Sequence, residues 1–389
     1  GEYYTPDWLA GYLVERSGYL GDPATRFLDP ACGSGTFLVQ AIRRVGEFAT
    51  QQSRARIAEI GRAILNGVVG FDLNPLAVLA ARTNYLIAFA RFLPYVRPFS
   101  IPVYLCDSVV PPDRRTERQI SMFDEDIVVF RTREHDYVFP LSMKDKDRID
   151  RFCALVVEGL RAKLDAAGFR RRLAKDLPLK AREQNLLEQV YLCIKRLDDE
   201  NRNGIWAHYI KNAFAPVYVD QFDFVVGNPP WIRWGYLSAE YRARTLRLWH
   251  DYGLFSLKGH ETRLGAGEKD FSMLFTYACA DRYLKDGGTL AFVITEEVFK
   301  SKGAGEGFRR FRIGESGAKL KALWMEDMVQ LQPFQAANKT TIFAMSKGKA
   351  TTYPLPAVEW RRKSGVGKIP PAWTLEQVDE RYAAFLTIL

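Results

Sequence analysis

The chain has 389 residues, 47% of them hydrophobic, which is enough for one large α/β domain with an insertion or for two modest domains. Its net charge of +9 fits a polyanionic partner such as a nucleic acid, although a merely soluble surface can carry the same charge. Five scattered cysteines argue against a disulfide framework, and four histidines without metal-ligand spacing indicate no metal ion. No leader segment and no uninterrupted run of about eighteen apolar residues is present, so we expect a cytoplasmic protein with no membrane contact.

Five short apolar runs, each closed by a polar or acidic residue, alternate with helical patterns. They cover residues 25–30, 67–74, 101–108, 222–230 and 288–297. This alternation predicts an α/β fold in which helices cover both faces of a parallel sheet. Two later runs, at 320–328 and 340–347, have only a short connection between them and therefore predict a closing antiparallel hairpin.

The stretch between Asp107 and Asn228 is far longer than an ordinary connection, so we expect a helical insertion at about 113–216. An apolar stripe at helical spacing predicts one amphipathic helix there, on Leu187, Val190, Tyr191, Ile194 and Leu197. The basic segment 161–182 fits either contacts to phosphates or a solvated helix face.

The two ends of the chain carry further expectations. We assign residues 1–349 to a catalytic domain and 350–389, rich at first in Pro, Gly and basic residues, to a linker and the start of a following, mostly absent domain. A start at Gly1 without Met suggests a piece cut from a longer protein.

Three successive predicted strands end in residues suited to a nucleotide-like ligand. After the first strand, Gly33 and Gly35 let the backbone turn sharply and approach a ligand, but the lysine of a phosphate-binding P-loop is missing. Asp72 ends the second strand, where a carboxylate reaches ribose hydroxyls; the alternative is a helix cap, a role that Asn74 can fill. Asp107 follows the third strand and could accept the amino group of an adenine.

The fourth strand ends in Asn228, Pro229, Pro230 and Trp231. Two consecutive prolines hold a stiff extended turn, so their carbonyls point in defined directions. The Asn228 side-chain oxygen and the Pro229 carbonyl then offer two acceptors to one amino group, and Trp231 offers a flat face on which an extruded base can stack. The alternative is a rigid turn beside a core tryptophan.

This combination resembles the amino-methyltransferases of restriction-modification and phage-defence systems, in the adenine-N6 branch where the cofactor motif precedes the catalytic one. The resemblance implies a Rossmann-like S-adenosyl-L-methionine-dependent fold with a mostly parallel seven-stranded sheet and an antiparallel last strand. It also implies duplex DNA with a flipped adenine as substrate, and other subunits of a restriction or defence complex as partners. Cofactor contacts are expected from Tyr4, Thr5, Pro6, Asp29, Pro30, Ala31, Cys32, Gly33, Gly35, Thr36, Asp72, Leu73, Asp107, Ser108, Asn228, Asp270 and Phe271. Substrate contacts are expected from Trp231, Arg233 and Phe334.

The likeness leaves several points open. The four residues Asn228–Trp231 end in Trp where the family more often has Tyr or Phe. We expect this chain to lack the separate recognition domain that usually follows the catalytic core in the family. Cytosine N4, adenine in RNA or a protein glutamine would use the same two acceptors, and a cofactor-holding scaffold subunit is a further alternative. Residues 232–268, which include Arg233, Arg242, Arg244 and Arg247, are the candidate clamp over the flipped strand.

Overall fold

The computed structural model describes residues 4–50, 56–114, 127–132, 135–200, 206–254, 270–301, 304–334, 339–363, 369–370 and 372–388. The chain divides into two compact units: Gly1–Val103 together with Asp220–Leu389, and Tyr104–Val219. The sequence places its insertion at about 113–216, within the range of this second unit.

The first unit is built on a nine-stranded sheet with the order β12-β11-β9-β10-β8-β7-β1-β2-β3. Its strands are β1 (Phe27–Asp29), β2 (Val68–Asp72), β3 (Val103–Leu105), β7 (Phe222–Gly227), β8 (Leu284–Thr295), β9 (Leu320–Asp327), β10 (Thr340–Lys347), β11 (Pro356–Arg362) and β12 (Tyr382–Ile388). The pairs β2–β1, β1–β7 and β7–β8 are parallel, whereas β10 runs antiparallel to both β8 and β9. The predicted α/β fold, with its mostly parallel sheet and antiparallel β10, is confirmed.

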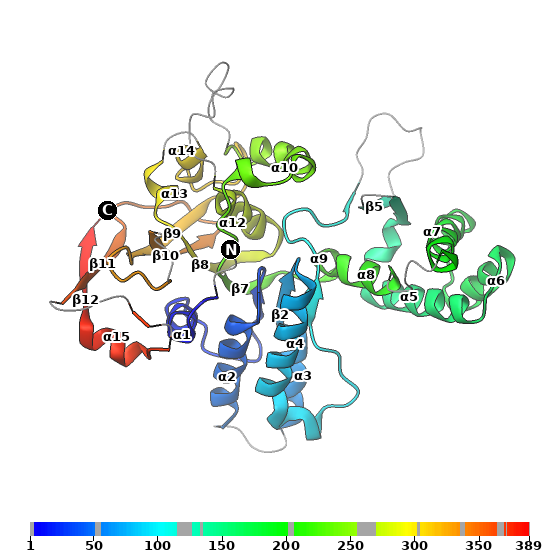
Figure 1. The fold of residues 1–389 in the computed structure, drawn as a ribbon, viewed down its shortest axis with the longest axis horizontal. Coiled ribbons are helices and arrows are strands. Elements are labelled where there is room, and N and C mark those ends of the chain that lie inside the picture. Colours follow the sequence, from blue (N-terminus) through cyan, green and yellow to red (C-terminus); the bar gives the residue numbers. More distant parts are fainter. Residues whose placement is uncertain are drawn as a thin grey trace. The chain divides into compact units, whose positions relative to one another are not determined.

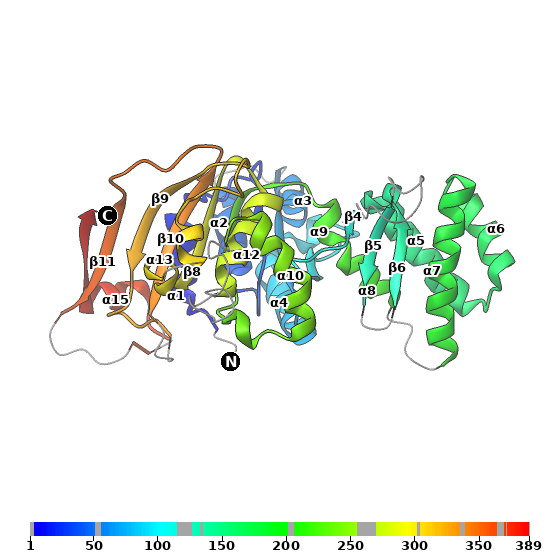
Figure 2. The ribbon, with the colours of Figure 1, turned by 90° about the horizontal axis from the view of Figure 1, so that it is seen from above.

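The sheet has two strands more than the seven expected, and both come from residues 350–389, which the sequence assigned to a linker and the start of a following domain. β11 pairs parallel with β9, and β12 pairs antiparallel with β11 at the end of the sheet (Figure 2). Prolines and glycines flanking β11 hide its strand pattern, but Ala357 and Trp360 are buried against the sheet. The linker prediction for residues 350–389 therefore differs from the structure over Pro356–Arg362 and Tyr382–Ile388.

A buried carboxylate joins this C-terminal addition to the start of the chain. Glu326, in β9, is 0% exposed and accepts hydrogen bonds from Tyr12 Oη at 2.9 Å, Arg16 Nε at 2.7 Å and Trp360 Nε1 at 2.9 Å. Burying a charge is unfavourable unless it is paired and hydrogen-bonded, and three donors meet that need. The helix α1 (Asp7–Arg16) is thereby held to β9 and β11.

The helices of the first unit form two groups in Figure 1, with α1 to α4 below and α10, α12, α13 and α14 above. They are α2 (Thr36–Thr50), α3 (Ile57–Gly67), α4 (Pro75–Phe89), α10 (Ala239–Asp251), α12 (Phe271–Arg282), α13 (Glu297–Lys300), α14 (Ala304–Phe308) and α15 (Leu375–Arg381). Residues 271–280 of α12 are all buried, which makes it the central helix of this layer. Among the described residues, one helical segment, Pro75–Tyr95, is long and apolar enough by composition to cross a membrane, a test that core helices of soluble proteins also pass.

The second unit has its own core between a small antiparallel sheet and several helices. Its elements are β4 (Asp113–Arg114), β5 (Ile127–Arg131), β6 (Asp136–Pro140), α5 (Lys146–Arg161), α6 (Ala166–Asp176), α7 (Ala181–Asp199), α8 (Trp206–Ala213) and α9 (Ala215–Tyr218). The amphipathic stripe predicted for α7 is confirmed, except that Leu197 is only half-buried. Tyr191 of that stripe stacks on Phe169 of α6 with ring centroids 3.8 Å apart.

Two arginines of the basic segment 161–182 are paired with acids of the same unit. Arg170 lies 3.5 Å from Glu188, and Arg172 lies 2.6 Å from Glu158. These ion pairs favour the solvated helix face over the phosphate contacts that the sequence left as an alternative.

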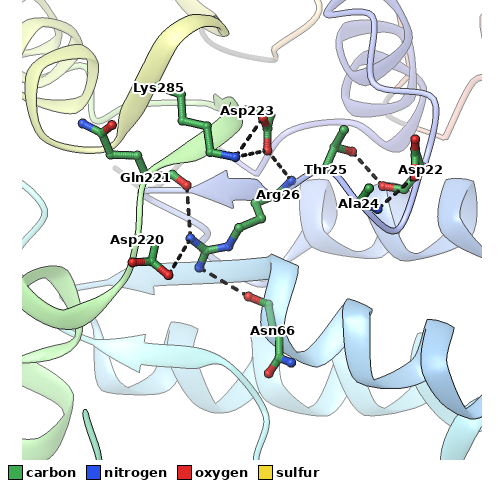
Figure 3. Close-up of polar contacts among 9 residues, drawn as sticks. All are labelled: Asp22, Ala24, Thr25, Arg26, Asn66, Asp220, Gln221, Asp223 and Lys285. Atoms are coloured by element: carbon green, nitrogen blue, oxygen red, sulfur yellow. Dashed lines mark hydrogen bonds and ion pairs between the residues drawn. The ribbon is translucent and has the colours of Figure 1, made fainter. Parts of the chain in front are cut away.

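A polar network ties together the amino ends of β1, β7 and β8 (Figure 3). Asp223 accepts from the Arg26 backbone N–H at 2.8 Å and from Lys285 Nζ at 2.9 and 2.8 Å. The Arg26 guanidinium donates to the carbonyls of Gln221 and Asn66, at 3.1 and 3.4 Å. The amino ends of these strands are thus used for structural hydrogen bonds, and in open α/β sheets ligands bind at the opposite, carboxyl ends.

Candidate functional site

Four parallel strands end next to one another at the carboxyl edge of the large sheet. The neighbours β2, β1, β7 and β8 end at Asp72, Asp29, Gly227 and Thr295. Open α/β sheets bind their ligands outside this edge because the turns that leave the strands there diverge. The motif residues recognised in the sequence from β1, β2 and β7 are therefore brought to one place.

The glycine-rich turn after β1 is fastened to the end of β2. Gly33 and Gly35 have φ angles of +50° and +87°, which side chains rarely adopt. The Gly33 N–H donates to Asp72 Oδ2 at 2.8 Å, and the Cys32 N–H donates to the Phe71 carbonyl at 2.8 Å. Asp72 thus shapes the turn from the neighbouring strand.

The helix cap left open by the sequence falls to Asn74. Its side-chain oxygen accepts from Leu76 N–H at 2.9 Å, while Asp72 Oδ1 accepts from Asn74 N–H at 2.7 Å. Both oxygens of the half-buried Asp72 therefore accept hydrogen bonds from the backbone of the neighbouring turns.

Asp29 is a buried carboxylate with an unmet need for a donor. It is 0% exposed; Oδ1 accepts from Ala31 N–H at 3.2 Å, whereas Oδ2 has no hydrogen-bond partner among the described residues. Burial raises the pKa of Asp29 well above its usual value, and the negative charge of Asp72 raises it further. A hydrogen-bond donor or a positive charge beside Oδ2 would offset the unfavourable burial of this carboxylate.

Asn228 presents a second unpartnered atom beside it. Its Nδ2 donates to Thr5 Oγ1 at 3.1 Å, which orients the amide, and its Oδ1 is buried without a partner among the described residues. Pro229 is buried and Pro230 half-buried, and neither has an N–H to satisfy that oxygen. Asn228 Oδ1 is thus a buried acceptor to which no described residue donates.

Two aromatic rings lie next to this turn. Trp231 Nε1 donates to the Val293 carbonyl of β8 at 3.1 Å, so the indole is anchored to the sheet. The ring of Phe334 meets it edge to face, with centroids 4.9 Å apart and an interplanar angle of 79°. Trp231 is half-buried and Phe334 is 5% exposed, so the accessible ring face is that of Trp231.

Asp270 and Phe271, which the sequence placed near the cofactor, lie against the segment that follows Asn228–Trp231. Asp270 Oδ1 caps α12 through Ser272 N–H at 2.9 Å, and Oδ2 accepts from Thr295 Oγ1 at 3.1 Å. Burial raises the pKa of Asp270, against these hydrogen bonds, which lower it. The Phe271 N–H donates to the Ile232 carbonyl at 2.8 Å, and the backbones of Asp270 and Arg233 form a β-bridge.

The remaining cofactor residues predicted in the first unit differ in accessibility. Tyr4 and Leu73 are exposed, at 70% and 60%. Pro30, Cys32 and Gly35 are buried in the turn, Ala31 and Thr36 are half-buried, and Pro6 is buried at the start of α1. For both the exposed pair and the buried group, contact with a cofactor stays a prediction.

Asp107 and Ser108 belong to the second unit. Asp107 Oδ1 accepts from the N–H groups of Val109 and Val110, at 2.8 and 2.9 Å, and Ser108 is buried. This gives Asp107 a turn-capping role, and its contact with a cofactor adenine stays a prediction.

The candidate clamp, residues 232–268, is described as far as residue 254. Arg242 covers the ring of Trp234 at 5.4 Å, and Arg247 forms an exposed ion pair with Asp251 at 3.3 Å. Arg233 and Arg244 are exposed. Residues 255–268 and the motif residues 335–338 lie outside the described part of the chain.

Sequence reasoning missed Gly227 as a site residue. A Cβ at this position would lie 2.5 Å from Asp29 Oδ1, so only glycine lets β7 pass this carboxylate. Its place immediately before Asn228, at a strand end, was the available signal. Within the described ranges, no group of three or more His, Cys, Asp or Glu side chains could hold a metal ion.

Two curated proteins are similar to parts of this chain. The adenine-specific methyltransferase PglX of Streptomyces coelicolor is 29% identical over 134 residues, which cover 31% of this chain and 11% of that protein. The methylase subunit of the type I restriction enzyme EcoEI from Escherichia coli is 27% identical over 177 residues, 43% of this chain and 32% of that subunit. The chain therefore matches at most about a third of the length of these relatives.

Two solved structures share the fold. A modification subunit of a putative type I restriction enzyme from Vibrio vulnificus YJ016 aligns over 99% of this chain and 55% of its own, with a TM-score of 0.50 and 12% identity. The DNA-bound type ISP restriction-modification enzyme LlaBIII aligns over 99% of this chain and 22% of its own, with a TM-score of 0.51 and 14% identity.

Family models identify the chain more directly. The model for N-6 DNA methylase matches residues 1–89. The model for the Eco57I restriction-modification methylase matches residues 66–319, well over half of the chain, which therefore belongs to the Eco57I restriction-modification methylase family.

Proposed function

We propose that the protein containing this chain transfers a methyl group from S-adenosyl-L-methionine to the exocyclic N6 amine of adenine in DNA. The observation that carries the proposal is the buried Asn228 Oδ1, which lacks a partner among the described residues while Thr5 holds the other end of the amide. Names of the relatives agree, since one is an adenine-specific methyltransferase and the other a methylase subunit.

The amine to be methylated is a poor nucleophile because its lone pair is delocalised into the adenine ring. Asn228 Oδ1 and the Pro229 carbonyl would accept its two N–H groups, which favours a tetrahedral nitrogen and stabilises the positive charge that develops on it. No strong base is required, since the proton becomes acidic once that charge has developed. The Thr5 hydroxyl keeps the Asn228 oxygen, rather than its NH₂ group, turned toward the amine.

The residues at the strand ends fit S-adenosyl-L-methionine, which supplies an electrophilic methyl group on sulfur. Asp29 would pair with its ammonium, Asp72 would accept from its ribose hydroxyls, and the exposed Leu73 would lie against its base. Of the three, Asp29 has the clearest need for a ligand group, because its buried Oδ2 lacks a hydrogen-bond donor among the described residues.

Trp231 would receive the flipped adenine on its accessible face. Extruding a base from a duplex costs a few kcal/mol, and stacking returns about 1–3 kcal/mol per base. Phe334, which the sequence predicts to contact the substrate, meets the indole edge to face and supports it from the side in this proposal.

The test compares wild type with Asn228→Ala on unmethylated duplex DNA, RNA and protein, with mass spectrometry of the hydrolysed products. We expect N6-methyladenine from DNA with the wild type, and at least a hundredfold loss for the variant with nearly unchanged cofactor binding by calorimetry. Methylation of cytosine, RNA or glutamine would redirect the proposal to that amine. Cofactor binding without any transfer would favour a scaffold subunit.

We also propose that the protein acts with other subunits in a restriction-modification or phage-defence system. This rests on the relatives described as a methylase subunit and a modification subunit. Co-purification from its own host at natural full length is the measurement.

A further inference from the structure

An aromatic ring stands in solvent just after the catalytic turn. Tyr236 is 81% exposed, more than any other large hydrophobic side chain described. It ends a single turn of 3-10 helix, Trp234–Tyr236, five residues after Trp231. Exposing so much aromatic surface to water is unfavourable, so this ring would gain free energy by packing against a binding partner.

The backbone that carries this ring is anchored on both sides. Before it, the Ile232 carbonyl accepts from Phe271 N–H at 2.8 Å, and the Tyr236 N–H itself donates to the Arg233 carbonyl at 2.9 Å. After it, Ser238 Oγ caps α10 by accepting from Tyr241 N–H at 3.2 Å. The ring is therefore presented from a braced segment.

The neighbouring aromatic in the same turn is engaged within the chain. Arg242 covers the ring of Trp234 at 5.4 Å, and Trp234 is half-buried. Tyr241 packs its ring against Phe271 with centroids 5.8 Å apart. Tyr236 is thus the ring of this segment that faces outward.

The charge around Tyr236 indicates the chemistry of its partner. Arg233, Arg244 and Arg247 are exposed on the same segment, against the exposed acids Glu240 and Asp251, of which Asp251 pairs with Arg247. The remaining positive charge favours a polyanion. Five residues of chain span at most about 18 Å, so the ring stays within a few base-pair steps of the base held at Trp231. DNA-binding proteins insert apolar side chains between base steps, where the ring gains stacking surface.

We propose that Tyr236 enters the duplex at the position left by the flipped adenine and stacks between the bases that remain. The inference rests on the proposed function, which supplies the flipped base. The ring closes the gap in the stack and so stabilises the extrahelical state that Trp231 receives.

The experiment uses the protein at its natural full length, with total methyl transfer to unmethylated plasmid DNA and to the same DNA after heat denaturation. For Tyr236→Ala we expect methylation of the duplex to fall about 5-fold to 150-fold, the change for one lost stacked base. Methylation of denatured DNA should stay within about twofold, because single strands have no gap to fill. Tyr236→Phe keeps the stacking face and should retain the duplex rate.

Tyr353→Ala is the matched control. Tyr353 is 65% exposed and follows β10, two residues after Thr351, which is bonded to Leu320 at the amino end of β9. It therefore lies at the opposite edge of the sheet, and its loss should change neither rate.

The outcomes separate the two proposals. If the wild type is active and Tyr236→Ala leaves the ratio of duplex to single-strand methylation unchanged, the proposed insertion of Tyr236 is overturned and the proposed function is not. Equal losses on both DNAs also overturn the insertion, because they would mean that the ring supports the pocket or contacts another part of the protein. If the wild type is as inactive as Asn228→Ala on every DNA, the proposed function is overturned, and the proposed insertion of Tyr236 with it.

Discussion

Replacing Gly227 with alanine should impair methyl transfer strongly while leaving the protein folded. The added Cβ would lie 2.5 Å from Asp29 Oδ1 and 3.3 Å from Asp29 Cγ, while ordinary contact begins at 3.4 Å. The shortfall to the oxygen is 3.4 − 2.5 = 0.9 Å. Asp29 is fully buried and cannot turn into solvent, so the end of β7 or the carboxylate must move.

The magnitude follows from which atoms move. Overpacking by one methyl group costs about 1–3 kcal/mol of unfolding free energy. Asn228 follows Gly227 directly, and a misplacement of about 1 Å at a reacting centre costs about a hundredfold in rate. We therefore expect kcat/KM to fall by about two orders of magnitude and cofactor affinity to fall as well, in a protein that remains folded at 25 °C.

The assay is the initial rate of methyl incorporation into DNA, with cofactor affinity by calorimetry and the melting temperature as the measure of folding. Gly11→Ala is the control, because its Cβ would meet the Gln40 side chain at 3.6 Å, an ordinary contact. Wild-type rate and cofactor affinity in Gly227→Ala would refute the close approach of β7 to Asp29.

Three further substitutions test separate contacts. Burial raises the pKa of Asp29, so the stability of the wild type should fall as the pH rises above the pKa of an Asp carboxyl in the unfolded chain, about 3.9. Asp29→Asn removes that loss and should raise the unfolding free energy of the ligand-free protein by about 1–3 kcal/mol at pH 7. The same substitution should weaken cofactor binding. Thermal melts from pH 5 to 8 check the stability, and a less stable variant would contradict the prediction. Thr5→Val should lower kcat about tenfold by releasing the Asn228 amide, with Thr5→Ser restoring it; equal rates would show that the contact does not orient Asn228. Glu326→Gln should cost about 1–3 kcal/mol in denaturant unfolding by weakening its bond to Arg16, and an unchanged midpoint would contradict the docking of α1.

Local patterns carried most of the fold and the order of the motifs. A strand that ends in a glycine turn, an acidic residue or a proline-locked turn can be recognised from a few neighbouring residues, because backbone conformation there depends on those residues alone. Parallel strands share a carboxyl edge, so Asp29, Asp72 and Asn228 could be expected together before any coordinates were known.

The strands β11 and β12 were not predicted from the sequence. β11 is short and flanked by Pro and Gly, and β12 follows the helix α15 directly, so neither shows a clear strand pattern in the sequence. Each becomes a strand because a sheet edge is available to pair with. β9 offers that edge to β11, and Trp360 completes the donors around Glu326.

By itself, the sequence determined the α/β class, the strand ends that hold the candidate site residues, and the family resemblance, because these depend on residues close together in the chain. Only the tertiary structure decided which distant atoms meet: Thr5 on Asn228 across 223 positions, Trp231 on the Val293 carbonyl across 62, and Gly227 against Asp29. The physical reason is that such contacts arise from strand order and close packing, in which each atom's neighbours come from other parts of the chain.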